Sequence, residues 1–499
     1  MDKQYEKHLS HYYGEMNALL NVSALEEAFL VATKALSEKS APPEHPAMQI
    51  ARVVMHLHKC LAEGALTADN ILALSETITL SEERKQLLFR TLQLAQFQLS
   101  LYPVPAKFIQ AYFAAWDQPN PHLDPEDLKK RLNLIAESLL GHESITCSSH
   151  EGWKGIEEYA RVTLLSLFYQ DVWLFIWVIC HLMERQIQLP LDKRDPLILS
   201  WFVVVCNIGC GNKVKKELIT HHKATLSASN GRDAAQILVV FAYTQCHFIA
   251  PLSEAGKYLS QSMQIAQGGD RIWVAAAPLY QFALYLHTSF NLELFQTPVG
   301  TALEQGRSIK MPGMVFRVLM YLQIIRCLRY GDSPTLETPQ YSLTQHLNSL
   351  QGEINSTSRI HIFPSVGLLW LLYERYNAIR ELLIPLVQAP RRITFCFLHA
   401  DWAFLLSVAN QKLGLKPVAG LQEELAELAS FDPSTHEWKI FYLRGDYLKA
   451  LLIASDNQCH WGTFICAREV IRNGISEGNL ELAQKAFSKL QAALVVATR

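Results

Sequence analysis

The sequence predicts an all-α protein, folded as a TPR-like α-solenoid, that is, a superhelix of stacked helical hairpins. Three observations predict it. Apolar residues recur at helical spacing (i, i+3, i+4, i+7) throughout the chain. No Asn-Gly or Asp-Gly turn joins two segments of alternating polarity, as β-hairpins would require. The 499 residues also exceed the length at which a single hydrophobic core stops growing. Stacked repeats need no such single large core, because each repeat packs only against its neighbours.

The helices follow one another between clusters of Pro, Gly, Asn and Asp. First helices of successive hairpins are expected near residues 195, 232, 271, 312, 356 and 391, a spacing of about 35–44 residues that is typical of helical repeats. We therefore divide the chain into N-terminal helical hairpins (1–150), an apolar helical segment continuing the array (151–230), the superhelix core (231–430), and C-terminal hairpins with a cap (431–499).

The most apolar stretch runs over residues 172–183 and resumes over 197–206. Each piece is shorter than the roughly 18–20 apolar residues that a bilayer crossing needs. We expect two buried core helices here and no membrane span.

Two hairpin turns share one pattern near the C-terminus. Gly445 and Gly478 are each followed by a polar helix start and by a small residue five positions later, Ala450 and Ala483. A small residue there lets the two helices of a hairpin approach closely. The segment 376–380 is a weaker third instance.

Charge and cysteine usage exclude several classes of protein. Formal net charge is −2, so there is no basic surplus for nucleic acid, and we expect no nucleic-acid partner. Ten scattered cysteines lack the density of a disulfide framework, and most should be buried hydrophobes. The first twenty residues lack the apolar core of a Sec signal, so we expect a cytoplasmic protein, or one secreted without a Sec signal if it is an effector.

The segment 237–295 carries a family resemblance. It contains an aromatic-rich helix ending in His247, then Pro251-Leu252, a second helix, the turn Gly269-Asp270, and a tyrosine-rich helix with Trp273 and Ala275–Ala277. This arrangement resembles the TPR-like superhelical region that follows the STAND-type ATPase module of large bacterial signalling kinases, a region related to that of maltose-regulon-type activators. The resemblance implies a non-catalytic sensor or interaction platform. The chain lacks that family's phosphate loop, kinase motifs, phosphoacceptor module and DNA-binding tail.

Candidate chemical sites are weak. Cys206, Cys210, His221 and His222 have zinc-ligand residue types, but i, i+4 cysteines in an apolar helix favour core packing, and we expect no metal and no cofactor. The pairs Cys246/His247, Cys396/His399 and Cys459/His460 have no orienting acid or oxyanion donor marked nearby, so we expect no catalytic residues. The segment 209–213 lacks the spacing of a phosphate loop and predicts a hairpin turn.

Aromatic and arginine side chains are the best candidates for partner contact, because first helices line the inner face of TPR-like arrays and these residue types dominate binding energy. The candidate partner-binding residues are Tyr243, His247, Trp273, Tyr280, Arg317, Tyr321 and Arg326.

The function expected from the sequence is a non-catalytic scaffold or sensor module that binds a protein segment, or a small regulatory ligand, in its concave groove. Two alternatives stay open. One is a secreted bacterial effector that acts on host proteins, and the other is an enzyme whose active site lines the groove without forming a motif.

Overall fold

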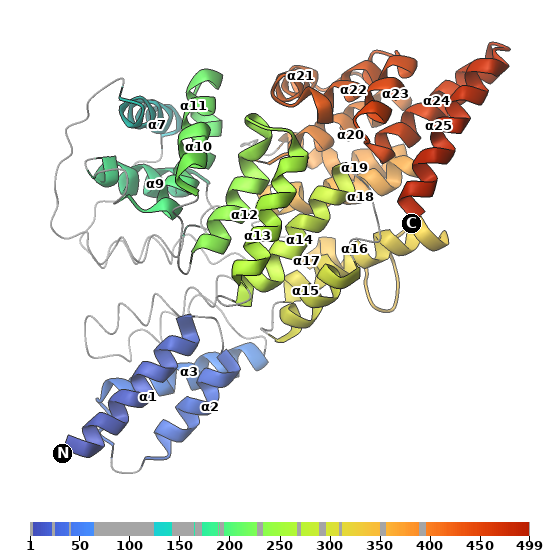
Figure 1. Cartoon of the computed structure of the whole chain (residues 1–499). Helices are drawn as coiled ribbons and strands as arrows, with labels where there is room; N and C mark the ends of the chain where they lie inside the picture. The colour runs from blue at the N-terminus through green and yellow to red at the C-terminus, as the bar shows by residue number, and fades with distance from the viewer. Residues whose placement is uncertain are drawn as a thin grey trace.

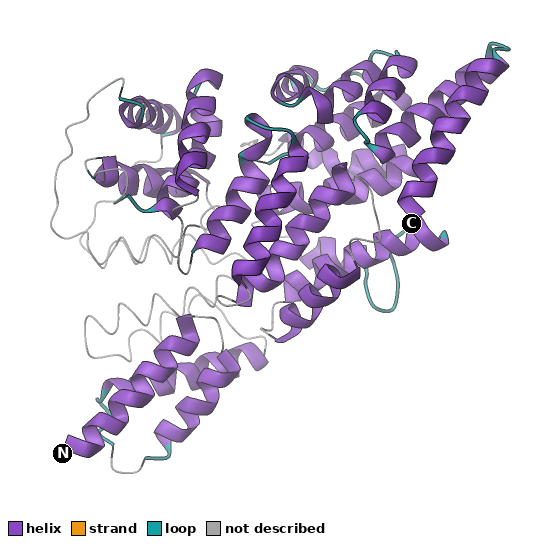
Figure 2. Cartoon of the chain, in the orientation of Figure 1, coloured by secondary structure: helices purple, strands orange, loops and turns teal. Residues whose placement is uncertain are grey.

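The computed structural model is helical throughout the residues that it describes, and Figure 2 shows helices joined by loops. One isolated β-bridge, between Glu337 and Ser342, is the nearest approach to a strand within them. The all-α prediction is therefore confirmed. The structure describes residues 3–21, 25–38, 41–63, 124–141, 164, 172–187, 189, 194–226, 233–266, 271–288, 296–308, 312–349, 356–388 and 396–498. The predicted turn at Gly269-Asp270 lies outside these residues.

Three N-terminal helices form a hydrophobic core of their own (Figure 1). Leu9, Met16, Ala32 and Ala51 are fully buried at its centre. These helices are α1 (Lys3–Asn21), α2 (Leu25–Leu36) and α3 (Pro46–Ala62).

The two apolar stretches form helices of the main core, as expected. In the helices Val172–Ile187 and Pro196–Gly209 most of the described side chains are buried, because these helices pack against each other and against their neighbours. Asp124 and Asp195 cap the helices that follow them, and a proline occupies the first turn of each. No described helix has the length and apolarity to cross a membrane. The group comprises α7 (Pro125–Leu139), α9 (Val172–Ile187), α10 (Pro196–Gly209) and α11 (Asn212–Thr225).

Hairpins follow in succession from α12 onward (Figure 1), and the second helix of a hairpin packs against the first helix of the next at α13–α14, α15–α16, α19–α20, α21–α22 and α23–α24. First helices begin at residues 234, 271, 312, 356 and 398 in the described parts, close to the expected starts. The elements are α12 (Ala234–Thr244), η4 (Cys246–Phe248), η5 (Leu252–Glu254), α13 (Ala255–Ala266), α14 (Arg271–Thr288), α15 (Gln296–Ser308), α16 (Pro312–Tyr330), α17 (Leu343–Ser349), α18 (Ser356–Leu372), α19 (Tyr376–Gln388), α20 (Leu398–Lys412), α21 (Leu421–Phe431), α22 (Pro433–Leu443), α23 (Tyr447–Asp456), α24 (His460–Ser476) and α25 (Leu480–Thr498).

Helices α12 and α20 are buried on almost all sides. A helix that is hydrophobic all round belongs in the middle of a protein, whereas a helix lining an open groove keeps one solvated face. Hydrogen bonds also join segments that are far apart in the sequence. Trp461 Nε1 donates a hydrogen bond to the carbonyl of His287 at 2.8 Å, and the Leu252 amide donates to Asp432 Oδ2 at 3.0 Å.

The two predicted hairpin turns have the expected geometry. Gly445 and Gly478 adopt positive φ values of 80° and 72°, which favour glycine. A Cβ on Gly474 would lie 3.2 Å from the Cβ of Ala483, so α24 and α25 meet there through small residues. The small residue after each turn is thus a packing requirement.

Candidate functional site

Most of the side chains predicted to contact a partner are placed inside the protein. Tyr243, His247, Trp273 and Tyr321 are buried. Tyr243 packs edge-on against Tyr280 and against Phe397, with ring centroids 4.7 and 5.1 Å apart. Their side chains therefore hold helices together in this structure.

The other predicted contact residues are more accessible. Tyr280 and Arg317 are half-buried, and Arg326 is exposed. Arg326 forms a 3.0 Å ion pair with Asp332 at the end of α16. Partner binding by these residues stays a prediction.

The zinc-like residues are engaged in packing. His222 Nδ1 lies 2.7 Å from Gln245 Oε1, and Gln245 Nε2 donates to the carbonyl of Ser200. Within the described residues no group of three or more His, Cys, Asp or Glu side chains could hold a metal ion.

The cysteines beside histidines are buried and free. Burial raises the pKa of Cys246, Cys396 and Cys459 each to about 12. At neutral pH these thiols are protonated, and a protonated thiol is a poor nucleophile.

A chain of polar side chains crosses the interior between four first helices. Ser365 Oγ of α18 lies 3.1 Å from His287 Nε2 of α14, and His287 Nδ1 lies 2.8 Å from Asp401 Oδ2 of α20. Lys439 Nζ of α22 donates to the other oxygen of Asp401 at 2.5 Å, and it lies 2.8 Å from His436 Nδ1. We call these five residues the buried polar chain.

The electrostatics of the buried polar chain centre on Asp401. Burial alone would raise the pKa of this carboxyl group, but the charges of Lys439 and His287 outweigh burial and hold its pKa below the usual range. Burial, reinforced by Lys439, lowers the pKa of His436 to about 3. At neutral pH the chain therefore contains a carboxylate paired with an ammonium group, and a neutral His436.

Within the buried polar chain the histidine contacts the serine on one side and the aspartate on the other, as in the Ser-His-Asp triad of hydrolases. However, Ser365 is completely buried, and His287 and Asp401 are each 1% exposed. Ser365 also lies within α18, directly after Pro364. The arrangement can tie α14, α18, α20 and α22 together, but in this conformation it offers no route to a substrate.

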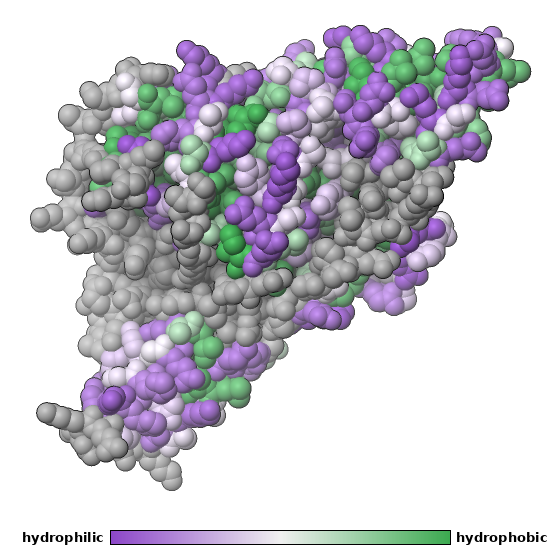
Figure 3. Space-filling model, viewed as in Figure 1, coloured by the Kyte–Doolittle hydropathy of each residue, from purple (hydrophilic) through white to green (hydrophobic). Residues whose placement is uncertain are grey.

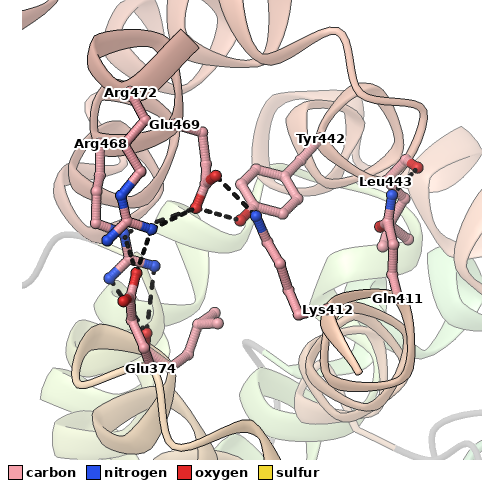
Figure 4. Close-up of polar contacts among 9 residues, drawn as sticks. Glu374, Gln411, Lys412, Tyr442, Leu443, Arg468, Glu469 and Arg472 are labelled. Carbon is pink, nitrogen blue, oxygen red and sulfur yellow. Dashed lines mark hydrogen bonds and ion pairs between the residues drawn. The ribbon is translucent and has the colours of Figure 1, made fainter. Parts of the chain in front are cut away.

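A second polar cluster runs from the turn between α18 and α19, at the surface, to buried side chains of α22 and α24 (Figure 4). Glu374 of this turn pairs with Arg472 at 2.5 Å and with Arg468 at 3.3 Å, both on α24. Glu469 pairs with Lys412 of α20 at 2.7 Å and accepts a hydrogen bond from the Tyr442 hydroxyl. We call this cluster the turn clasp.

The backbone at Glu374 is strained. Its φ is 58°, in the left-handed region that costs a non-glycine residue about 1–2 kcal/mol. It occupies the place that Gly445 and Gly478 hold in the later hairpins. A non-glycine residue in a glycine position points to a use for its side chain, and that use here is the carboxylate's contact with α24.

Aromatic and arginine side chains surround this turn on the solvent side. Tyr330 is 72% exposed and Tyr373 is 39% exposed. The Tyr373 hydroxyl donates to the carbonyl of Cys327 at 2.9 Å, which brings the turn against the end of α16. Arg326 and Tyr330 share one face of α16, being four residues apart. We call Arg326, Tyr330, Tyr373 and Arg472 the tyrosine–arginine patch.

Sequence reasoning found one member of this patch, Arg326, and missed the other three. A signal existed, because Glu374-Arg375-Tyr376 aligns with Gly445-Asp446-Tyr447 at the hairpin turn. The pairing of Glu374 with α24, however, spans nearly a hundred residues and has no local signature.

Neither the protein-family models nor the curated proteins compared with this chain gave a match. The resemblance to the kinase-associated superhelix accordingly stays an expectation.

The buried histidines predict how stability depends on pH. Burial lowers the pKa of His222, His247 and His346 to about 4, from an ordinary value of 6.5. Between pH 6.5 and 4 the unfolded chain binds protons that the folded chain does not, so the free energy of unfolding should fall as pH falls through this window. Each histidine should contribute about 2 kcal/mol of this loss by pH 4.5.

Urea unfolding at several pH values, followed by tryptophan fluorescence, measures this slope. His247→Leu should make the slope shallower, because it removes one of the titrating groups. A free energy of unfolding that stays constant from pH 7 to 4.5 would contradict the prediction.

The turn clasp predicts an unusual order of stability at one position. Glu374→Ala should destabilise the protein by about 1–2 kcal/mol, because it removes the ion pairs and keeps the left-handed residue. Glu374→Gly removes the same ion pairs but relieves the backbone, so it should be about 1 kcal/mol more stable than the alanine variant.

Urea midpoints of the two variants and the wild type test this order. The comparison of Gly with Ala isolates backbone strain, and the comparison of Gly with Glu isolates the carboxylate. Equal stability of the Gly and Ala variants would show that the turn carries no strain.

Proposed function

We propose that this protein is a non-catalytic, TPR-like helical-repeat module that binds another protein, and that the tyrosine–arginine patch is its main contact surface. The sequence-based interpretation placed binding along the inner helices of residues 232–330. The proposal keeps α16 and Arg326 from that interpretation and moves the rest of the surface to the α18–α19 turn.

The observation that carries the proposal is that tyrosine and arginine side chains are exposed beside a turn that other contacts hold in place. Tyrosine and arginine supply large contact areas with several hydrogen-bond groups, and they are enriched where binding energy concentrates. Tyr330 is 72% exposed, which is unusual for so large an apolar surface in a protein whose other aromatic residues pack largely inside. The hydroxyl contact of Tyr373 and the ion pairs of Glu374 fix the turn, so a partner would meet a preordered surface.

The enzyme alternative has one observation in its favour, the Ser365–His287–Asp401 order. A catalytic reading requires the interior to open between α14, α18 and α20, and the paired charges of Asp401 and Lys439 oppose that opening. A serine-reactive phosphonate that labels Ser365 in the folded protein would favour the enzyme over the binding module.

The effector alternative differs in the source of the partner and leaves the fold unchanged. Capture from a host-cell extract in preference to an extract of the producing cell would support it. The tyrosine–arginine patch would serve either role.

Substitutions in the patch test the proposed function. The intact chain is used to capture proteins, which are identified by mass spectrometry, and the affinity for each retained protein is then measured in purified form. Arg326→Ala and Tyr330→Ala should each weaken binding by about 1–3 kcal/mol while stability changes by less than about 0.5 kcal/mol. Arg317→Ala, on the half-buried side of α16, tests the inner surface that the sequence predicts.

Arg444→Ala is the matched control, because Arg444 is an exposed arginine at a different hairpin turn. It should leave affinity unchanged. Normal binding by both Arg326→Ala and Tyr330→Ala would place the contact surface elsewhere, and early melting of either variant would make it a packing residue.

A further inference from the structure

The last helix, α25, has two different faces. Ala483, Ala486 and Ala493 are buried and face the interior, where α25 packs against α24. The side of α25 next to this buried stripe exposes Leu480, Gln484, Phe487 and Gln491, whose spacing of four, three and four residues is that of the contact seam of a coiled coil. Leu480 is 70% exposed and Phe487 is 49% exposed. The outward face therefore has the pattern of a helix that packs against a second helix.

The preceding hairpin shows what happens to the same positions when a helix covers them. Aligned on Gly445 and Gly478, Phe487 corresponds to Ala454, and Leu480 corresponds to Tyr447. Ala454 is completely buried in α23, which packs between α22 and α24. The position of Ala454 is therefore covered by neighbouring helices in the α22–α23 hairpin, whereas the equivalent position of Phe487 is exposed in the α24–α25 hairpin.

Charged residues flank this seam, with acidic residues first and basic residues later along the helix. Glu477 and Glu481 lie at its amino-terminal end, and Lys485 and Lys489 follow one to two turns later. Glu481 and Lys485 keep 78% and 72% of their side-chain surface exposed. A helix that is acidic at one end and basic further along is complementary to a copy of itself lying antiparallel.

The geometry of such a pair is simple. A two-fold axis through Gln484 sets Leu480 of one copy about one residue, roughly 1.5 Å, from the level of Phe487 of the second copy. The two glutamine amides face each other at the axis, and each acidic end lies beside a basic segment. The same surface serves both copies, as a two-fold interface requires.

We propose that this protein forms a two-fold homodimer in which the α25 helices of two copies pack antiparallel through Leu480, Gln484 and Phe487. Hydrophobic surface continues beyond the seam at this end of the molecule, over α22–α25 (Figure 3), where Leu448 and Leu452 of α23 are also exposed. Lys489 Nζ donates to Ser455 Oγ of α23 at 2.9 Å, which holds α23 and α25 in one surface. The dimer goes beyond the proposed function and uses none of the residues of the tyrosine–arginine patch, so either proposal can fail alone.

Sedimentation velocity or light scattering of the full chain, measured over a wide range of concentration, tests the proposal. The wild type should change from monomer to dimer as concentration rises. Phe487→Ser and Leu480→Ser should each weaken dimerisation by about tenfold or more while the melting temperature and helical signal are kept. Leu415→Ser, at an exposed leucine outside α25, is the matched control and should leave the dimer unchanged.

A charge exchange tests the antiparallel arrangement independently of hydrophobicity. Lys485→Glu alone should weaken the dimer, because it adds an acidic residue beside the acidic end of the second copy. The double variant Glu481→Lys with Lys485→Glu exchanges the two inner charges in both copies, so residues 481 and 485 of the two copies again have opposite charges, and it should restore dimerisation.

Three outcomes would overturn the homodimer. A wild type that stays monomeric at every concentration would do so, as would a dimer that the α25 substitutions leave intact. A monomer that binds a different protein through Phe487 would assign the seam to another occupant.

Discussion

The ion pair between Asp401 and Lys439 sets the arrangement of the main core. Both side chains are almost completely buried, so water cannot solvate either charge, and removing one partner would leave the other uncompensated at a cost of about 3–5 kcal/mol. The second oxygen of Asp401 contacts His287, so the carboxylate fixes α20 against both α14 and α22. Apolar contacts between helices tolerate small shifts, whereas this pair has one satisfactory geometry. It therefore defines how the hairpin of α14 lies against the two later hairpins that contain α20 and α22.

Later hairpins fill part of the surface that the sequence predicts as the inner face of a groove. Sequence periodicity shows which face of a helix is apolar, and residue type together with a place on a first helix favours the aromatic candidates as contacts on that inner face. Neither signal shows that a much later helix will cover that surface. Trp461 of α24 donates its indole N–H to the His287 carbonyl, and Phe397 meets Tyr243, so the inner side of α12 and α14 is filled by later parts of the chain.

Local features of the fold were predictable because local chemistry determines them. Asp195 and Pro196 begin α10, and the glycines at 445 and 478 supply the left-handed turns between helices. The helix starts and the C-terminal turns were therefore found. The turn clasp was not found. The alignment of Glu374 with the turn glycines marks only the turn, and the contacts of Glu374 with arginines on α24 leave no local signature in the sequence. Buried polar chains are equally hidden, because Ser365, His287, Asp401 and Lys439 come from four separate hairpins.

The buried polar chain and the turn clasp each contain a cation at the same position of a hairpin. Lys439 lies six residues before Gly445, and Arg472 lies six residues before Gly478, so the two cations occupy equivalent positions. Lys439 pairs with Asp401 of α20, and Arg472 pairs with Glu374 at the α18–α19 turn. In both hairpins a cation at this position therefore reaches back to a carboxylate of an earlier hairpin. The buried pair is sealed from water, and the second lies at the surface with Arg472 half-exposed. Breaking a buried ion pair costs several times what a surface pair contributes. The same position therefore gives rigid registration in the core, and at the surface it gives a weaker pair that helps to fix the α18–α19 turn beside the tyrosine–arginine patch.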